Sequence, residues 1–349
     1  MMDLPDWPRS LGSPETSGVI RRCPEDFFVE EIPRVSPTGE GSHLWLWVEK
    51  RSANTDWVAG ELAKLAGCPH RDVGYAGMKD RHAVTRQWFS LPITDASLHA
   101  LENIDIAGIQ VLESLRHGRK LKRGTLDGNR FRIRIHELQG DVEQTRIRLE
   151  QVRETGVPNY FGPQRFGHGG RNLELGLKLL QKGVRLKRNK KSIYLSAIRS
   201  FLFNQVLAER VRADTWKTII DGELAMLDGT QSIFPCTMPD QEIEDRCRRH
   251  DIHPTGPLPG ENGTQPAGTV AELEQQVMQA WPQLIETLVC QRVQASRRAL
   301  RLYPAALEWD ISADRLELTF ELPPGAYATT LLREILVVTE PPRNQDRDL

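Results

Sequence analysis

Strand-like segments lie at both ends of this 349-residue chain, and a helix-rich stretch separates them. This order constrains the fold strongly, because the two end segments can share one sheet only if the stretch between them forms a body of its own. The length is also too great for one ordinary hydrophobic core. We therefore predict an α+β fold in which one domain interrupts another.

The run from Phe131 to Ile135 has the clearest strand pattern in the first 150 residues. Phe131, Ile133 and Ile135 alternate with Arg132 and Arg134, which puts the apolar and basic residues on opposite faces of a strand. The other elements predicted here are strands over Asp26–Ile32, Leu44–Val48 and Val84–Leu91, and a helix that has Asn54 or Thr55 as its N-cap and ends before Gly67.

Beyond residue 155 the pattern becomes helical. The segment IHPTGPLPGENGTQPAGT, with eight Gly or Pro in 18 residues, is typical of a loop. After Tyr303-Pro304 the strand pattern returns. The elements predicted in this part are helices over Ser192–Ala213 and Thr269–Leu302, strands over Leu307–Ile311 and Arg315–Leu322, and a helix over Ala328–Val337.

Composition and motifs argue against several classes of protein. No apolar run approaches the ~20 residues of a membrane helix, and the first residues lack the pattern of a secretory signal. The five cysteines are scattered without a CxxC pair, and the grouping of Cys247 with His250 and His253 lacks a fourth metal ligand. Phosphate loops, dinucleotide fingerprints and the zinc-deaminase pattern are also missing. We therefore expect a cytoplasmic protein that uses no metal, no nucleotide and no other cofactor.

Positive charge is concentrated in two runs, although the net charge is only −1. Residues 116–134 contain eight Lys or Arg and one acid, and residues 182–191 contain six Lys or Arg and no acid. Such runs create local fields that can hold a phosphate backbone, but solvated surfaces carry similar runs. By themselves the runs leave both interpretations open.

The segment GYAGMKDRHAVTRQ, residues 74–87, contains a candidate catalytic carboxylate. Gly74 and Gly77 allow close backbone approach and could deliver Asp80 into a concave site. An aspartate after such a turn is, however, more often a turn or N-cap residue. The local sequence alone therefore favours a structural role for Asp80.

This segment resembles the signature AG-x-KD-[KR]-x-AVT-x-Q of the TruD family of pseudouridine synthases. Four more segments are similar to family blocks and follow in the family's order, namely RCPEDFFVEE at 22–31, LDGNRF at 126–131, GVPNYFGPQRFG at 156–167 and LPPGAYATTLLRE at 322–334. The resemblance implies a catalytic domain with an antiparallel mixed sheet and flanking helices, over residues 1–154 and 303–349. It also implies that a large helix-rich, family-specific domain over residues 155–302 interrupts the catalytic domain.

The resemblance further implies that the chain isomerises uridine to pseudouridine in tRNA, at uridine 13 of the D arm, without a cofactor. Asp80 matches the family's nucleophile, and both C6 of the uracil and C1′ of the sugar remain open as the atom attacked. Arg21 stands where the family carries a basic residue ahead of the PEDF block, and it would keep Asp80 ionised. Arg22 and Lys79 are the alternatives for this cationic partner.

Three further residues are candidates for contacting the substrate, and the family has a substrate-contacting Phe in its EDF block. Phe27 matches such a Phe, although a strand position beside Phe28 also suits a core residue. Asn129 could hydrogen-bond the uracil edge or serve a turn. Tyr327 stands where the family has Phe, so its ring could still stack, and its hydroxyl needs a partner if it is buried.

The partner implied is tRNA, which we expect a monomer to bind, with the two basic runs lining a cleft between the domains. The residues leave two other functions open, a non-catalytic RNA-binding or chaperone protein on the same fold and a hydrolase of free nucleosides. The retained KD, PEDF and GN residues disfavour the first, and the basic runs disfavour the second.

Overall fold

The computed structural model of the protein describes residues 4–93, 106–312 and 314–342. The chain divides into two compact units. The sheet unit consists of Glu15–Gln144, Pro304–Gly325 and Leu336–Leu349, and the helix-rich unit consists of Met1–Pro14, Thr145–Tyr303 and Ala326–Ile335. The α+β class predicted from the sequence is confirmed.

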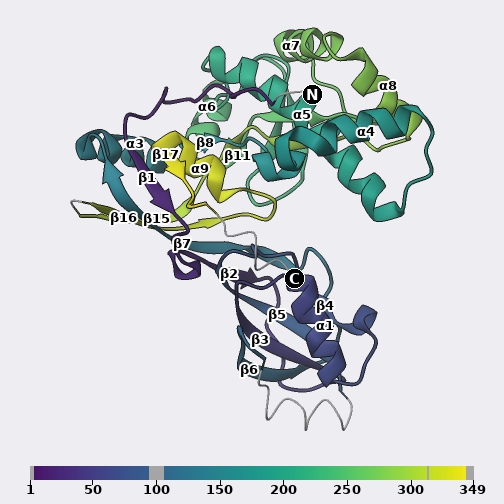
Figure 1. The fold of residues 1–349 in the computed structure, drawn as a ribbon. Coiled ribbons are helices and arrows are strands. Elements are labelled where there is room, and N and C mark those ends of the chain that lie inside the picture. Colours follow the sequence, from purple (N-terminus) through teal and green to yellow (C-terminus); the bar gives the residue numbers. More distant parts are fainter. Residues whose placement is uncertain (1–3, 94–105, 313, 343–349) are drawn as a thin grey trace. The chain divides into compact units, whose positions relative to one another are not determined.

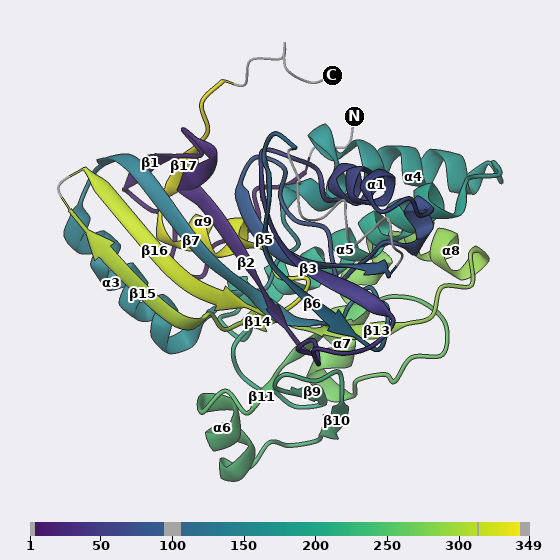
Figure 2. The same ribbon diagram turned by 90° about the horizontal axis from the view of Figure 1, so that it is seen from below.

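A ten-stranded mixed sheet forms the sheet unit, with its main strands in the order β15-β16-β7-β2-β5-β3-β6 (Figures 1 and 2). Off this path, β1 pairs with β7 and β17, and β4 pairs with β5. All pairs are antiparallel except β2 with β5 and β1 with β17. The strands are β1 Ser17–Ile20, β2 Phe27–Pro33, β3 His43–Arg51, β4 Gly74–Tyr75, β5 Val84–Pro92, β6 Ile109–His117, β7 Leu126–Gln139, β15 Ala305–Ile311, β16 Arg315–Leu322 and β17 Val337–Thr339.

The alternation predicted for residues 131–135 is confirmed in β7. Phe131, Ile133 and Ile135 are buried, while Arg134 is only partly buried and pairs with Glu317 of β16 at 2.6 Å. The sequence periodicity therefore identified the face of β7 that enters the core, because side chains alternate across a strand.

Helix α1, Thr55–Leu65, covers part of the sheet. Its buried residues Val58 and Leu62 pack in one cluster with Leu46 of β3 and Phe89 of β5. This cluster anchors the segment that leads from α1 to β5, and that segment carries Asp80.

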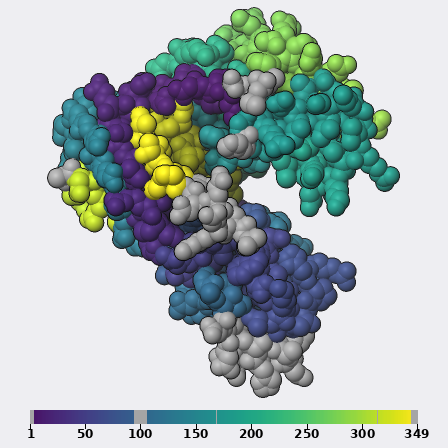
Figure 3. Space-filling view, in the orientation of Figure 1, coloured from purple at the N-terminus to yellow at the C-terminus, as the bar shows by residue number. Residues whose placement is uncertain are grey.

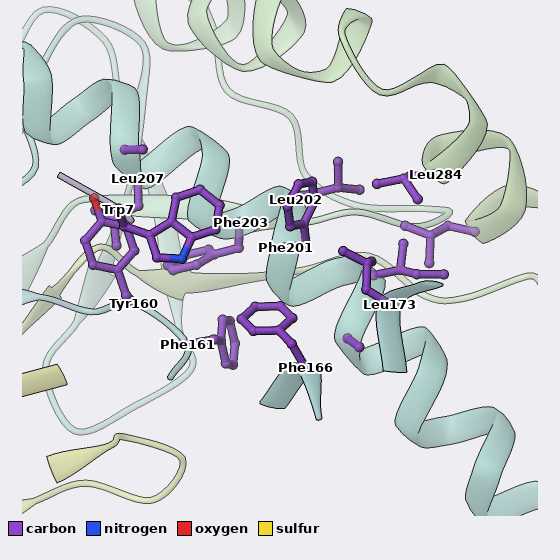
Figure 4. Close-up of a cluster of buried hydrophobic side chains, with 14 of the residues drawn as sticks. Trp7, Tyr160, Phe161, Phe166, Leu173, Phe201, Leu202, Phe203, Leu207 and Leu284 are labelled. Carbon is purple, nitrogen blue, oxygen red and sulfur yellow. The ribbon is translucent and has the colours of Figure 1, made fainter. Parts of the chain in front are cut away.

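The core of the helix-rich unit surrounds the long helix α5, Arg188–Arg212 (Figure 4). Trp7 stacks on Tyr160 with ring centroids 5.9 Å apart and meets Phe201 of α5 edge-on. The other elements of this unit are α4 Arg171–Gln181, α6 Gln241–Arg248, α7 Gly268–Gln279, α8 Pro282–Cys290, α9 Ala328–Ile335, β8 Val157–Pro158, β9 Glu223–Leu227, β10 Ile233–Cys236, β11 Ile252–His253, β12 Thr255–Leu258, β13 Ser296–Ala299 and β14 Arg301–Leu302; α3 Val142–Thr155 runs from the sheet unit into it.

Segments from the N-terminal and C-terminal parts of the described chain lie side by side within each unit, and Figure 3 shows them as purple beside yellow. In the sheet unit β1 runs parallel to β17. In the helix-rich unit the buried Glu334 of α9 accepts hydrogen bonds from Ser10 and from the backbone of Leu11. Burial raises the pKa of the Glu334 carboxyl.

The helix predicted over Thr269–Leu302 was wrong in its second half. Helix α7 ends at Gln279, and α8 begins at Pro282 because proline cannot continue a preceding helix. Residues Ser296–Ala299 form β13, which pairs with β12 inside the segment predicted to be loop. This strand pair depends on tertiary pairing that local periodicity does not contain.

Candidate active site

The segment from Gly74 to Asp80 connects β4 to the start of β5 and is held by side chains from two directions. The Thr55 hydroxyl accepts a hydrogen bond from the backbone N–H of Lys79 at 3.0 Å. The Gln87 amide donates to the carbonyl of Gly77 at 3.0 Å. These bonds give Asp80 a defined position at the end of an otherwise irregular segment.

The Asp80 carboxylate faces outward while its backbone is tethered from the core side. Its side chain is 46% exposed, and its Oδ1 lies 3.4 Å from Nη2 of Arg21. The Asp80 carbonyl accepts a hydrogen bond from the buried Lys50 ammonium at 2.7 Å. The arrangement leaves an oxygen of the carboxylate available for chemistry next to a cation.

Arg21 is held in an unusual conformation at the end of β1. Its φ of 57° is in the left-handed region, which is costly for a residue with a Cβ atom. Its guanidinium lies 4.0 Å from the centre of the Phe27 ring and also pairs with Glu340. Its Nε atom is buried and has no hydrogen-bond partner among the described residues.

The three cations considered as partners of Asp80 have different neighbours. Arg21 contacts Asp80, whereas Arg22 lies 3.4 Å from Glu137 at the surface. Lys79 is buried and pairs with the equally buried Glu31 at 2.7 Å. Burial raises the pKa of Glu31, and the Lys79 charge opposes that rise.

Phe27 and Asn129 lie on neighbouring strands of the same unit. Phe27 is only 2% exposed, beneath Arg21, and therefore belongs to the core in this structure. Asn129 stands opposite Glu31 of β2 and Leu322 of β16. The Asn129 Oδ1 is buried without a hydrogen-bond partner among the described residues, and such an atom is costly unless a ligand donates to it.

Tyr327 belongs to the helix-rich unit, whereas Asp80 belongs to the sheet unit. The hydroxyl of Tyr327 accepts a hydrogen bond from Nε of Arg165 at 2.9 Å. Its ring meets Phe161 edge-on, with centroids 6.2 Å apart. Arg165 is therefore the hydrogen-bond partner that the hydroxyl of Tyr327 needs and that a phenylalanine at this position would not need.

Sequence reasoning missed Lys50 and Glu340, both of which bear on the Asp80 neighbourhood. Lys50 follows Leu44, Leu46 and Val48 on the buried face of β3. A lysine at a core position of an alternating strand was the sequence pattern that could have identified it. Glu340 follows β17, and no local pattern connects it with Arg21.

The basic run at 116–134 covers the end of β6, the loop after it and the first part of β7. The loop after β6 docks on the Asp80 segment, since Gly124 N–H donates to the Ala76 carbonyl at 2.8 Å and Arg123 lies over the Tyr75 ring at 3.8 Å. A Cβ atom on Gly74 would lie 2.3 Å from the Leu121 carbonyl oxygen, so this close approach requires glycine. On β7, by contrast, Arg130 pairs with Glu321.

On the expectation from the sequence that Asp80 is the catalytic carboxylate, Lys50→Met should lower the rate of the catalysed reaction roughly 100-fold, because it removes the hydrogen bonds from the ammonium to the carbonyls of Ala53 and Asp80 and lets the carboxylate shift. Single-turnover kinetics on saturating substrate measures this effect. Unchanged turnover would show that the tether is dispensable.

The same variant should alter the pH dependence of stability. Burial lowers the pKa of Lys50 from 10.5 to about 8, so the folded state binds fewer protons than the unfolded state between those values. The free energy of unfolding contributed by this group therefore rises with pH across that window. Urea titrations at several pH values should show a smaller rise in Lys50→Met than in the wild type.

Within the described residues, no group of three or more His, Cys, Asp or Glu side chains could hold a metal ion. His253 is engaged by Asp228 and Arg301, and the Cys247 thiol donates to the Lys217 carbonyl. Among the residues that the structure describes, no helix is long and apolar enough to cross a bilayer.

The chain matches known proteins over almost all of its length. The model of a family described as tRNA pseudouridine synthase D (TruD) matches residues 9–186 and 183–335. Relatives named tRNA pseudouridine synthase D from Methylococcus capsulatus and Nitrosococcus oceani are 46% and 44% identical, over 95% and 94% of this chain and 94% and 93% of theirs. A solved structure of a proposed tRNA pseudouridine synthase D from Methanosarcina mazei matches the fold with a TM-score of 0.71 at 22% identity, over 94% of this chain and 95% of that one.

Proposed function

We propose a target and a mechanism for this chain, which belongs to the tRNA pseudouridine synthase D (TruD) family and is an enzyme that isomerises uridine to pseudouridine in tRNA. The target is uridine 13 of the D arm, and the nucleophile is Asp80. The observation that carries the mechanism is a tethered, half-exposed carboxylate beside an arginine.

The reaction breaks the N1–C1′ bond, turns the uracil and forms a C5–C1′ bond. The proton leaves C5 and N1 gains one, so atoms and electrons balance without an oxidant or reductant. A carboxylate suits this sequence because it can add to the uridine and later depart. Asp80 attacks either C6 of the uracil or C1′ of the sugar, and both routes need an ionised Asp80.

Arg21 is proposed to keep Asp80 ionised when the uridine excludes water from the site. Desolvation raises the pKa of a carboxyl group, and a cation in contact with it opposes the rise. The distance of 3.4 Å and the partly buried position of Arg21 support this role. Its pairing with Glu340 and its position over Phe27 support a guanidinium that is held in place.

Three residues are proposed to contact the extruded uridine. The buried Oδ1 of Asn129 can accept a hydrogen bond from N3–H of the uracil. Tyr327 offers a ring for stacking, with its hydroxyl already bound by Arg165. Phe27 reaches the base only if Arg21 moves from its place over the ring.

The proposed domain division assigns residues 1–154 and 303–349 to the catalytic domain and 155–302 to the insertion. The compact units differ from this division in that Met1–Pro14, residues 145–154, Tyr303 and Ala326–Ile335 pack with the helix-rich part. We further propose that the protein is a monomer and that it works in the cytoplasm without a cofactor.

Incubation of the purified protein with unmodified tRNA transcripts tests the function. Carbodiimide-dependent reverse-transcription stops should map pseudouridine at position 13 in the presence of EDTA, and a transcript with cytidine at position 13 should give no stop there. Modification at another position would contradict the target. Binding without modification would favour a non-catalytic RNA-binding protein.

A further inference from the structure

A cavity of about 580 Å³ opens in the helix-rich unit beside the first turns of α5. Four cations line it, Arg188, Lys191, Arg199 and Arg298. None of the described residues that line it is Asp or Glu. The cavity therefore gathers positive charge without a carboxylate in its wall.

Arg199 has unused hydrogen-bonding capacity at this cavity. Its Nη2 donates to the Leu258 carbonyl and the Ser296 hydroxyl, each at 2.8 Å. Its Nε is buried and has no hydrogen-bond partner among the described residues. Burial lowers the pKa of Arg199, which means that its charge is partly desolvated.

Arg298 adds a second desolvated cation. Its guanidinium lies 4.2 Å from the centre of the Phe161 ring and donates to Asn159. Burial, together with the neighbouring charge of Arg165, lowers the pKa of Arg298 to about 10. Arg165 itself donates to the hydroxyl of Ser196, which lines the cavity.

Neighbouring desolvated cations raise the electrostatic free energy of the folded protein unless an anion joins them. We infer that this cavity binds a phosphodiester group of the tRNA backbone, an inference that rests on the proposed function. Guanidinium groups suit this ligand because their planar N–H donors match phosphate oxygens.

Two of the cations that line the cavity favour a phosphate within a polymer over a free anion. Arg188 and Lys191 belong to the run at 182–191, which has six basic residues and no acid. Such an extended cationic surface suits a chain of phosphates, because each one that binds releases counterions.

The double variant Arg188→Gln/Lys191→Gln tests the inference, because Arg188 is exposed and Lys191 is partly exposed, so the change should leave the fold intact. The matched control is Arg171→Gln/Lys178→Gln, which removes two exposed cations from α4 of the same unit. Filter binding of an unmodified tRNA transcript from 50 to 200 mM KCl should show a Kd about tenfold higher for the first variant. The negative slope of the logarithm of the binding constant against the logarithm of the KCl concentration should be less steep by about 1.

A Kd and a salt slope equal to those of the control would overturn the inference. So would an unchanged tRNA affinity combined with a loss of thermal stabilisation by inorganic phosphate, because that result assigns the cavity to a free anion. The binding assay does not depend on turnover. A wild-type protein that bound tRNA without forming pseudouridine would therefore contradict the proposed function and leave this inference to be judged by the binding data.

Discussion

Asp80→Asn is expected to reduce pseudouridine formation by roughly a thousandfold or more, because a neutral amide can neither add to the uridine nor depart from it. The Asp80 side chain is 46% exposed, so the substitution buries no unpaired group and should leave the fold intact. Single-turnover assays measure the rate, and filter binding should show a tRNA affinity within about twofold of the wild type.

Asp310→Asn is the matched control for this substitution. Asp310 is an exposed residue of β15 in the same unit, so its change removes one surface carboxylate without touching the Asp80 neighbourhood. Full activity in the control and in Asp80→Asn alike would refute the assignment of the nucleophile. A loss of tRNA binding in Asp80→Asn would point to a structural role instead.

Lys79→Met should destabilise the sheet unit by about 3 to 5 kcal/mol, because it leaves a buried carboxylate without its cation. Lys79 and Glu31 are 4% and 1% exposed and lie 2.7 Å apart. Activity should fall as well, since Lys79 precedes Asp80 and its backbone is bonded to Thr55. Urea denaturation of the wild type and the variant measures the loss of stability.

Lys64→Met provides the control, because Lys64 forms a surface pair with Glu61 that is worth at most about 1 kcal/mol. The double variant Lys79→Met/Glu31→Leu should recover part of the lost stability, since it removes the unpaired carboxylate. Equal losses in Lys79→Met and Lys64→Met would show that the buried pair contributes no more than a surface pair.

The pH dependence of Lys79→Met follows from the direction of the Glu31 shift. Burial raises the folded-state pKa of Glu31 above its ordinary value of 4.5, and removing Lys79 removes the charge that opposes this rise. Between these two pKa values the folded state binds more protons than the unfolded state, so stability increases as the pH falls. The deficit of the variant should therefore shrink on acidification toward pH 4.5.

Local periodicity predicted six of the ten strands of the sheet unit, missed β1, β4, β6 and β17, and predicted part of the helix-rich unit poorly. The strand predicted over Arg315–Leu322 matches β16 at both ends, because one face of it is buried and the other is not. Residues Ser296–Ala299, in contrast, become a strand through pairing with β12. A strand that depends on a distant partner leaves little trace in its own sequence.

In the candidate site, too, some features could be predicted from the sequence and others depend on contacts between distant residues. The resemblance of five segments to family blocks pointed to Asp80, Asn129 and Tyr327 from sequence. The tether from Lys50 and the pairing of Arg21 with Glu340 join residues 30 and 319 positions apart. Such contacts arise only when strands from different parts of the chain meet in one sheet.

The sequence by itself determined the family, the α+β class and the residue types available for the reaction, because motifs and side-chain alternation are local properties. Only the tertiary structure decided which cation contacts Asp80, since Arg21, Arg22 and Lys79 are equivalent as charges until burial and geometry separate them. Lys79 pairs with the buried Glu31, Arg22 pairs with Glu137 at the surface, and Arg21 pairs with Asp80. The sequence supplied the carboxylate, and the packing around β1, β2 and β3 supplied its surroundings.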